Sequence, residues 1–316
     1  MTEATKNQIE NMKGQTFGVE IEMNNITREN AAKLSAEFFG TGKYKNTARE
    51  NGYMTWSAWD AKGREWKFSR DSSITGPDLE RCEMVTPILK YEDMEFLQEL
   101  TRQLRRGGAK SSPSRGCGVH IHIGGKGHTP QTIRNLVNLM ASHESQLTKA
   151  INIGSHRLSR YCKMVNRDFL TLVNTKKPST MPELENIWYE GNNANYGRTQ
   201  HYNDSRYHML NLHSFFHGHG TIEFRCFNFD EETADRKGGL HAGQLKSMIQ
   251  LCLAMSQLAK QLKTASPRPQ QTENEAYAFR CWMLRLGFIG DEFKTAREYF
   301  MRNFEGNSAW RRARAA

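Results

Sequence analysis

Two histidines separated by one residue are the side chains of this sequence with the clearest chemical potential. His120 and His122 lie in the segment 116–125, whose ends are rich in glycine. Because side chains alternate across a β-strand, a strand here would present both imidazoles on one face and apolar residues on the other. Imidazole binds metal ions and phosphate oxygens, and glycines let a ligand approach the backbone. The segment therefore indicates a ligand site, although histidines at a surface or in a core would fit the same pattern.

Carboxylates recur at alternate positions in further predicted strands. Glu20 and Glu22 share one face of the first, and Glu83 interrupts the second, which is otherwise largely apolar. Glu223 and Arg225 share one face of the third. Carboxylates with one imidazole suit Mg²⁺ or Mn²⁺, and these ions neutralise phosphate charge in phosphoryl transfer. Each strand alone is typical of a solvated face or a salt bridge, but the repetition favours one shared site.

Patterns typical of helices and turns separate these strands and would position their polar faces. Asp60–Gly63 predicts a hairpin turn between aromatic-rich strands. The segment Thr175–Gln200, rich in Asn, Pro and Gly, indicates a long loop. Apolar residues at three- and four-residue spacing predict helices, which span residues 27–40, 91–106, 129–147 and 239–263, with two shorter helices after 275.

Composition bounds the class of protein and its partners. A chain of 316 residues can form one large or two small cores. A net charge of +10 favours anionic partners, namely nucleotide phosphates, an acidic peptide or nucleic acid. The six cysteines form no Cys-x-x-Cys pair, so we expect reduced thiols and no zinc knuckle or disulfide framework. No apolar run reaches the ~18 residues of a membrane span and the first residues lack a signal-peptide core, so we expect a cytoplasmic protein.

Five short motifs, in order, resemble the amidoligase family of ATP-dependent carboxylate–amine ligases, whose fold is of the glutamine synthetase and glutamate–cysteine ligase type. The similarity extends over roughly residues 16–260. Motifs in this order are much more specific than any one of them. The matching segments are Phe17–Glu22, Cys82–Pro87, Gly116–His122, Arg206-Tyr207 with Asn211-Leu212, and Thr221–Arg225.

The resemblance implies an α+β fold in which a curved antiparallel sheet forms a funnel backed by helices, as in the glutamine synthetase catalytic domain. ATP and two to three Mg²⁺ or Mn²⁺ ions would lie inside. ATP would phosphorylate a carboxylate donor to an acyl phosphate, and an amine acceptor would displace phosphate to give a peptide or γ-glutamyl-like amide. Both substrates would be small molecules or peptides. The expected domains are a polar leader at 1–15, the catalytic domain at 16–264, and a helical extension with a basic tail at 265–316.

The same resemblance assigns the metal ligands. Glu20, His120 and Glu223 would bind the ion between the transferred phosphoryl group and the nucleotide. Glu22 and Glu83 would hold a second ion near the substrate carboxylate. The expected metal site therefore draws on strands from distant parts of the sequence.

The remaining site residues are expected to bind nucleotide and substrate. His122 would contact the nucleotide phosphates, and Arg225 would stabilise charge on the phosphoryl group in flight, acting with Glu223 in catalysis. Arg206, with Asn211 nearby, would bind a phosphate or a substrate carboxylate and so take part in catalysis and nucleotide binding. Further candidates for substrate binding are Asp71, followed here by Ser72 where family members often have Gly, and Arg160.

Three other functions fit parts of the sequence. A cupin-type metal enzyme also uses His-x-His on a strand, but it requires a Glu a few residues later, where this chain has Lys126, Gly127 and His128. A metal-dependent enzyme acting on nucleic acid would explain both the charge and the carboxylates, and would bind DNA in a salt-sensitive way. A nucleotide-binding module would bind nucleotide without releasing ADP. The ordered motifs favour the ligase.

Overall fold

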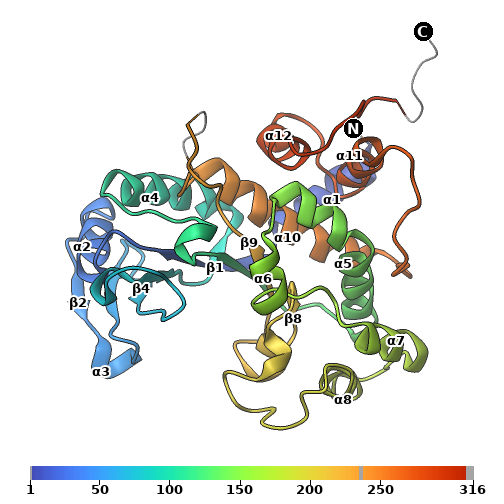
Figure 1. The fold of residues 1–316 in the computed structure, drawn as a ribbon, viewed down its shortest axis with the longest axis horizontal. Coiled ribbons are helices and arrows are strands. Elements are labelled where there is room, and N and C mark those ends of the chain that lie inside the picture. The colour runs from blue at the N-terminus through green and yellow to red at the C-terminus, as the bar shows by residue number, and fades with distance from the viewer. Residues whose placement is uncertain (1, 235–237, 311–316) are drawn as a thin grey trace. The chain divides into compact units, whose positions relative to one another are not determined.

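The chain divides into two compact units, each described here by itself. The computed structural model describes residues 2–234 and 238–310 (Figure 1). The sheet unit comprises Thr16–Ile121 and Phe227–Lys246. The helical unit comprises Met1–Gln15, His122–Cys226 and Ser247–Ala316. Strand β7 (Val119–Gly124) and helix α10 (Ala242–Gln261) contain residues of both.

An open antiparallel sheet forms the sheet unit. The strands follow the order β2-β3-β4-β5-β1-β7, with β6 pairing the start of β1. Along β1, alternation places Val19, Ile21 and Met23 in the core at 1% exposure or less, and turns Glu20 and Glu22 to the opposite face. The strands are β1 (Thr16–Met23), β2 (Tyr44–Asn46), β3 (Trp56–Trp59), β4 (Glu65–Ser69), β5 (Cys82–Val85) and β6 (Leu89–Lys90).

Helices α2 (Arg28–Phe38) and α4 (Met94–Arg106) cover the apolar face of this sheet (Figure 1). Helix α2 contacts β3, β4 and α4. Thr27 caps α2 by accepting a hydrogen bond from an N–H of its first turn, which satisfies a donor that has no partner within the helix. The unit also contains α3 (Ala48–Asn51) and the 3-10 turns η1 (Asp78–Glu80), η2 (Tyr91–Asp93) and η3 (Pro113–Arg115).

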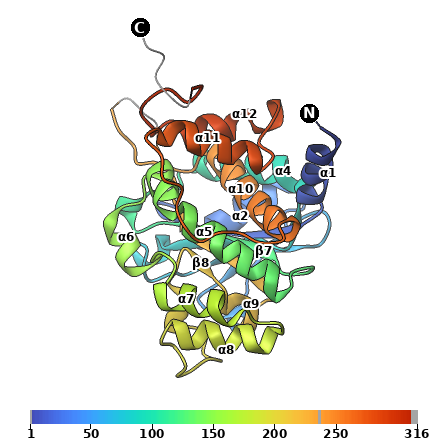
Figure 2. The same cartoon turned by 90° about the vertical axis from the view of Figure 1, so that its right-hand side faces the viewer.

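The helical unit packs its helices around α5 (Pro130–Ile151). Helix α7 (Arg167–Lys176) contacts both α5 and α8 (Met181–Gly191), as Figure 2 shows. The short strand β8 (Leu210–Asn211) pairs antiparallel with β9 (Thr221–Phe227). The other elements are α1 (Glu3–Lys13), α6 (Ser155–Arg160), η4 (Asp204–Arg206), α9 (His213–His217), α11 (Glu275–Arg285), η5 (Asp291–Phe293) and α12 (Lys294–Met301).

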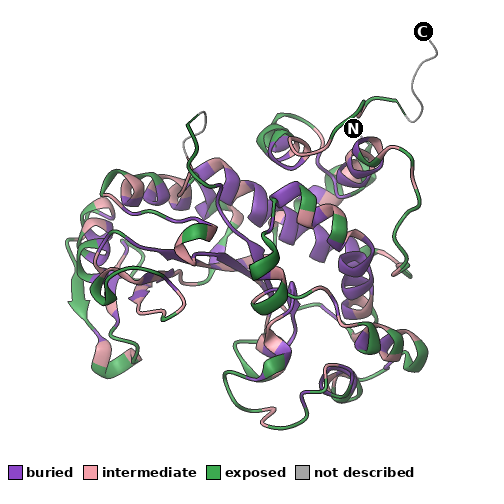
Figure 3. Ribbon diagram, in the orientation of Figure 1, coloured by how far each residue is buried: buried purple, intermediate pink, exposed green. Residues whose placement is uncertain are grey.

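The predicted fold class is confirmed at the level of a mixed α/β protein with a large antiparallel sheet backed by helices. Figure 3 shows the central strands as largely buried and the inward sides of the helices as buried, whereas the edge strand β2 is exposed. The predicted strands, the hairpin across Asp60–Gly63 and the long predicted helices are all present. Within the described ranges, no helix has the length and apolar character that crossing a membrane requires.

The prediction of a long loop over Thr175–Gln200 was wrong, because α8 lies inside it. Thr180 and Glu183 form a reciprocal capping box that starts this helix, and a proline occupies its first turn. The polar leader expected at 1–15 contains α1. The functional division at 264 stays a prediction, and the basic tail around Arg311 lies outside the described residues.

A cluster of charged residues fastens the β3–β4 hairpin to the start of α4. Asp93 accepts hydrogen bonds from Arg64 at 2.8 and 3.1 Å and from Lys62 at 3.0 Å. Arg64 also donates to Asp60 at 2.8 Å, and the indole N–H of Trp66 donates to the same carboxylate at 3.1 Å. The Asp93 side chain is only 7% exposed, so each of its oxygens needs these donors.

Protonation of Asp93 destabilises the folded state. Burial by itself would raise the pKa of this carboxyl, but hydrogen bonds from Arg64, from the backbone N–H of Lys90 and from Lys62 outweigh it and lower the pKa to about 2. A carboxyl whose pKa is lower in the folded state stabilises that state above its unfolded pKa of 3.8, and the stabilisation is lost as pH falls toward 2.

We expect Asp93→Asn to lower the free energy of unfolding at pH 7 by on the order of 3 kcal/mol, because it leaves buried donors around a neutral amide. The difference between wild type and variant should shrink between pH 4 and pH 2, where the wild-type carboxylate is lost. Urea unfolding at several pH values measures both effects. Glu99→Gln, at an exposed ion pair on α4, is the control and should leave the midpoint nearly unchanged. A constant difference at all pH values would contradict this account.

Candidate functional site

The register between β1 and β5 brings carboxylates together in the sheet unit. Glu22 lies directly opposite Glu83, and Glu20 lies opposite Val85. Residues facing each other across an antiparallel pair have Cβ atoms ~5 Å apart, so the Glu22 and Glu83 side chains rise side by side from the same face. A shift of one residue in this pairing would turn the carboxylate of one strand to the opposite face of the sheet from that of the other strand.

His120 on β7 joins these carboxylates. Its Nδ1 lies 2.9 Å from Glu20 Oε2, and its Nε2 lies 3.8 Å from Glu22 Oε1. The backbone N–H of Gly118 donates to the other oxygen of Glu22 at 2.5 Å. His120 and Glu22 are 5% and 4% exposed. Two carboxylates and an imidazole are thus held in one largely buried cluster.

Asp71, expected to bind substrate, lies beside the same carboxylates. Ligand atoms of Glu20, Glu83 and His120 lie within 4.8 Å of one another, and so do those of Glu22, Asp71 and Glu83. Glu83 belongs to both groups. Oxygen donors with one imidazole match the preferences of Mg²⁺ and Mn²⁺, so the donor set fits the expected cations.

A second polar cluster is centred on Glu223 in the helical unit. Asn211, opposite Glu223 in the β8–β9 register, donates its side-chain N–H to Glu223 Oε2 at 2.6 Å. Arg225 Nη1 donates to Glu223 Oε1, and His122 Nε2 lies 3.8 Å from the same oxygen. His122 is oriented by Thr221 Oγ1, 2.9 Å from its Nδ1. Glu223 is 2% exposed, so its charge depends on these neighbours.

The Arg225 guanidinium is fixed from further sides. Its Nε donates to the carbonyl of Tyr161 at 3.5 Å, and its Cζ lies 5.9 Å from the centre of the Tyr207 ring. Arg157 donates to the Arg225 backbone carbonyl at 3.2 Å. A guanidinium bound along one edge and stacked on a ring is held in one orientation.

Arg206 continues this stack. Its Cζ lies 5.8 Å from the Tyr207 ring centre and 5.3 Å from that of Tyr202, and its Nη1 donates to the carbonyl of His201 at 3.1 Å. In the part of the chain that the structure describes, its buried Nε has no hydrogen-bond acceptor. The two arginines expected to contact anions therefore share one tyrosine.

Two of the residues expected in the site differ in their surroundings. Asn211 contacts Glu223 directly, whereas Arg160 is exposed at the end of α6. Sequence reasoning missed Thr221, although its position two residues before Glu223 places it on the same strand face. Tyr207 lies in the Arg206-Tyr207 motif, but sequence reasoning gave this ring no role in the site.

The family comparison decides what kind of protein carries this site. A family model described as "putative amidoligase enzyme" matches residues 13–256, which include both clusters. The chain belongs to the amidoligase family. No curated protein sequence matches it.

A solved structure resembles this amidoligase-family chain over nearly its whole length. It is that of a bifunctional glutathione synthetase from Pasteurella multocida, with 13% sequence identity and a TM-score of 0.45. The alignment covers 96% of this chain and 49% of that one. The amidoligase-family chain thus spans about half the length of that protein.

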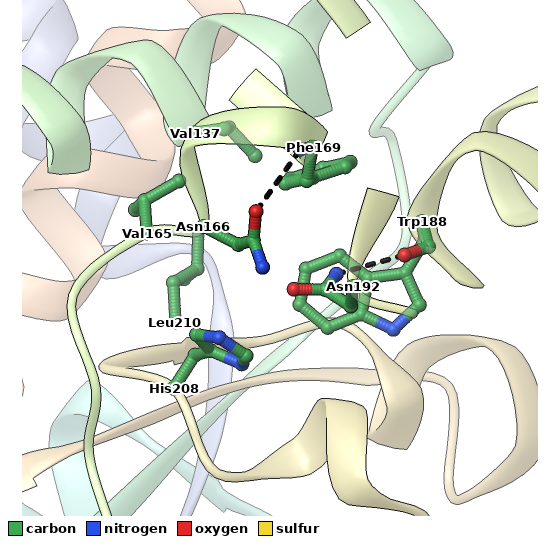
Figure 4. Close-up of a pocket in the computed structure, with 8 residues that line it drawn as sticks. All are labelled: Val137, Val165, Asn166, Phe169, Trp188, Asn192, His208 and Leu210. Atoms are coloured by element: carbon green, nitrogen blue, oxygen red, sulfur yellow. Dashed lines mark hydrogen bonds between the residues drawn. The ribbon is translucent and has the colours of Figure 1, made fainter. Parts of the chain in front are cut away.

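A cavity elsewhere in the helical unit is too small to hold a substrate. Its volume is ≈ 10 Å³, room for about one water molecule. His208 in its wall donates from Nδ1 to the carbonyl of Ser205. Burial lowers the pKa of His208, which favours the neutral ring. The lining, drawn in Figure 4, consists of Val137, Val165, Asn166, Phe169, Trp188, Asn192, His208 and Leu210.

The cysteines are reduced, as expected. All six are free, and all except Cys281 are buried. Burial, together with the charge of Glu22, raises the pKa of the Cys117 thiol to about 12. A thiol of such high pKa stays protonated near neutral pH, which makes it a poor metal ligand and nucleophile. The chemistry of the sheet unit therefore rests on its carboxylates and imidazole.

We expect Glu83→Gln to weaken Mn²⁺ binding by at least about tenfold, because it removes one charge and one ligand oxygen from both groups in the sheet unit. The free-ion electron paramagnetic resonance signal measures the affinity. Glu65→Gln is the matched control: Glu65 lies in the same sheet, but its Oε1 accepts hydrogen bonds from Asn51 and Ser57. Equal affinities of wild type and Glu83→Gln would contradict this assignment.

Proposed function

We propose that this amidoligase-family protein is an ATP- and Mg²⁺-dependent ligase that forms an amide between a carboxylate and an amine through an acyl phosphate. We also propose that its sheet belongs to the funnel type of glutamine synthetase. The observation that carries the proposal is the sheet-unit cluster: carboxylates and one imidazole form two groups, each with its ligand atoms within 4.8 Å of one another, inside the segment that matches the family.

The carboxylates of the sheet unit would hold the divalent cations. Glu20, Glu83 and His120 form one donor set, and Glu22 and Glu83 form another with Asp71 in place of a histidine. Divalent cations supply charge neutralisation for phosphoryl transfer when they are bound. The Gly118 N–H on Glu22 and the His120 ring on Glu20 keep these ligands in place before a cation arrives.

The helical unit would supply cationic donors for the phosphates. Arg225 is held by Glu223, Tyr161 and Tyr207 in one orientation, so little reorganisation accompanies charge development on a transferred group. Arg206 has an unsatisfied buried donor and suits a phosphate or a substrate carboxylate. His122, fixed by its hydrogen bond with Thr221, would contact nucleotide phosphates.

The order of the reaction follows from the chemistry of the substrates. A carboxylate oxygen attacks the γ-phosphorus of ATP and ADP leaves; an amine nitrogen then attacks the acyl carbon and inorganic phosphate leaves, with loss of one proton from nitrogen. The activated carboxylate, an acyl phosphate, thereby reacts with the amine without being released into water. Charge on the transferred phosphoryl group is where fixed guanidinium groups contribute most.

We expect ADP release only when Mg²⁺, a carboxylate donor and an amine acceptor are all present. Pools of carboxylates and amines, screened by mass spectrometry for a product lighter by one water, would identify the pair. Glu223→Ala should reduce ADP release by at least about 100-fold, because it removes the carboxylate that orients Arg225.

Glu185→Ala is the control in the same unit, since Glu185 pairs with His217. Glu223→Gln, which keeps the side-chain shape, separates loss of chemistry from loss of folding when thermal unfolding is measured alongside. Undiminished turnover in a folded Glu223→Gln or Glu223→Ala protein would overturn the assignment.

A further inference from the structure

One cationic side chain, that of Lys67, has no role in the proposed mechanism although it shares a face of the sheet with the carboxylates. Lys67 lies opposite Val85 in the β4–β5 register, and Val85 lies opposite Glu20 in the β5–β1 register. The three residues therefore form one row across the sheet, perpendicular to the strands. Side chains in such a row point to the same face.

Alternation along β4 fixes which face this is. Trp66 and Phe68, on either side of Lys67, are both 0% exposed and belong to the core that α2 covers. Lys67 therefore rises from the opposite face, the one that carries Glu20 and Glu83. This position results from strand register and is independent of any surface loop.

The Lys67 ammonium has no close hydrogen-bond acceptor among the described residues. Its nearest acid is Glu65, at 3.9 Å, which is beyond hydrogen-bond distance. The other oxygen of Glu65, Oε1, accepts hydrogen bonds from Asn51 and Ser57, which orient this carboxylate. Across the described ranges no hydrogen bond to Lys67 is found, and its side chain is 39% exposed. Three ammonium donors are thus available on a face dominated by carboxylates.

Spacing leaves room for a ligand between this lysine and the acid cluster. Lys67 and Glu20 are two strands apart, so their Cα atoms are separated by ~10 Å. Lysine and glutamate side chains are long enough to meet across that distance, but the Lys67 ammonium lies 3.9 Å from Glu65 instead. The distance also leaves room for a group the size of a carboxylate or a phosphate, which the lysine would bind from one side.

We propose that Lys67 is a binding residue for an oxyanion held at the carboxylate cluster of the sheet unit, either the carboxylate of the donor or a phosphate of the nucleotide. The inference rests on the proposed function, since a carboxylate cluster attracts an oxyanion only when it holds a cation. Lys67 would then supply a direct hydrogen bond to an oxygen of the bound group.

The test measures binding of inorganic phosphate to the Mg²⁺-loaded protein by calorimetry. Lys67→Met should weaken phosphate binding roughly 10- to 100-fold, the range for a charge-assisted hydrogen bond, and Lys67→Arg should restore most of it. Lys45→Met is the matched control: Lys45 lies in the same row, opposite Ser57, but pairs with Glu50 at 2.7 Å. It should bind phosphate like wild type.

Two further titrations identify the source of the oxyanion. If Lys67 binds a nucleotide phosphate, Lys67→Met weakens binding of the non-hydrolysable analogue AMP-PNP with Mg²⁺ as well. If it binds the donor carboxylate, acetate and phosphate affinities fall while that of AMP-PNP is kept. Unchanged phosphate affinity in Lys67→Met, or an equal loss in Lys45→Met, overturns the inference.

Mn²⁺ binding, measured first, separates this inference from the proposed function. Wild type and all three lysine variants should bind Mn²⁺ equally, because an ammonium is no metal ligand. A wild type that binds no Mn²⁺ overturns both proposals. If Mn²⁺ binding is normal but the phosphate affinity does not depend on Lys67, only the proposal about Lys67 is overturned.

Discussion

The pairing of β1 with β5 is the constraint on which the sheet-unit site depends. It sets Glu22 against Glu83 and Glu20 against Val85, so that carboxylates distant in sequence meet on one face. The opposite face of the same strands packs Ile21, opposite Met84, into the core at 0% exposure. Because a slip by one residue would exchange the two faces, the energy of core packing also specifies the site. Collecting like charges on one face is unfavourable, and core burial on the other face offsets it.

Strand alternation explains why much of this arrangement could be predicted from the sequence. The faces of β1, β7 and β9 follow from a two-residue period that is local, and the alternation of Val19, Ile21 and Met23 with glutamates already indicates which side is buried. Thr27 and Thr129 mark helix starts by chemistry that acts within one turn. Local rules of this kind need no knowledge of the tertiary structure.

What sequence reasoning missed depends on contacts between distant segments. Asp71 was expected to bind substrate, but its place beside Glu22 and Glu83 follows only from the pairing of β4 with β5 and of β5 with β1. The position of Lys67 likewise becomes meaningful only through two registers. Helix α8 is a different case: the Thr180–Glu183 capping box was present in the sequence, but the Asn, Pro and Gly content of the surrounding segment was given more weight. Composition is a weaker guide than a specific capping interaction.

The buried pair of Glu223 and Arg225 differs in kind from the charged cluster at Asp93. Both remove charges from water, yet a buried ion pair contributes little net stability compared with apolar residues of the same shape. Asp93 ties a hairpin to a helix, so its hydrogen bonds have a structural use. Glu223 and Arg225 are neighbours on one strand, already joined by the backbone, and their pairing fastens no distant element. Stability alone therefore gives little reason for this pair, whereas a guanidinium held in one orientation beside a carboxylate is what chemistry on an anionic substrate requires.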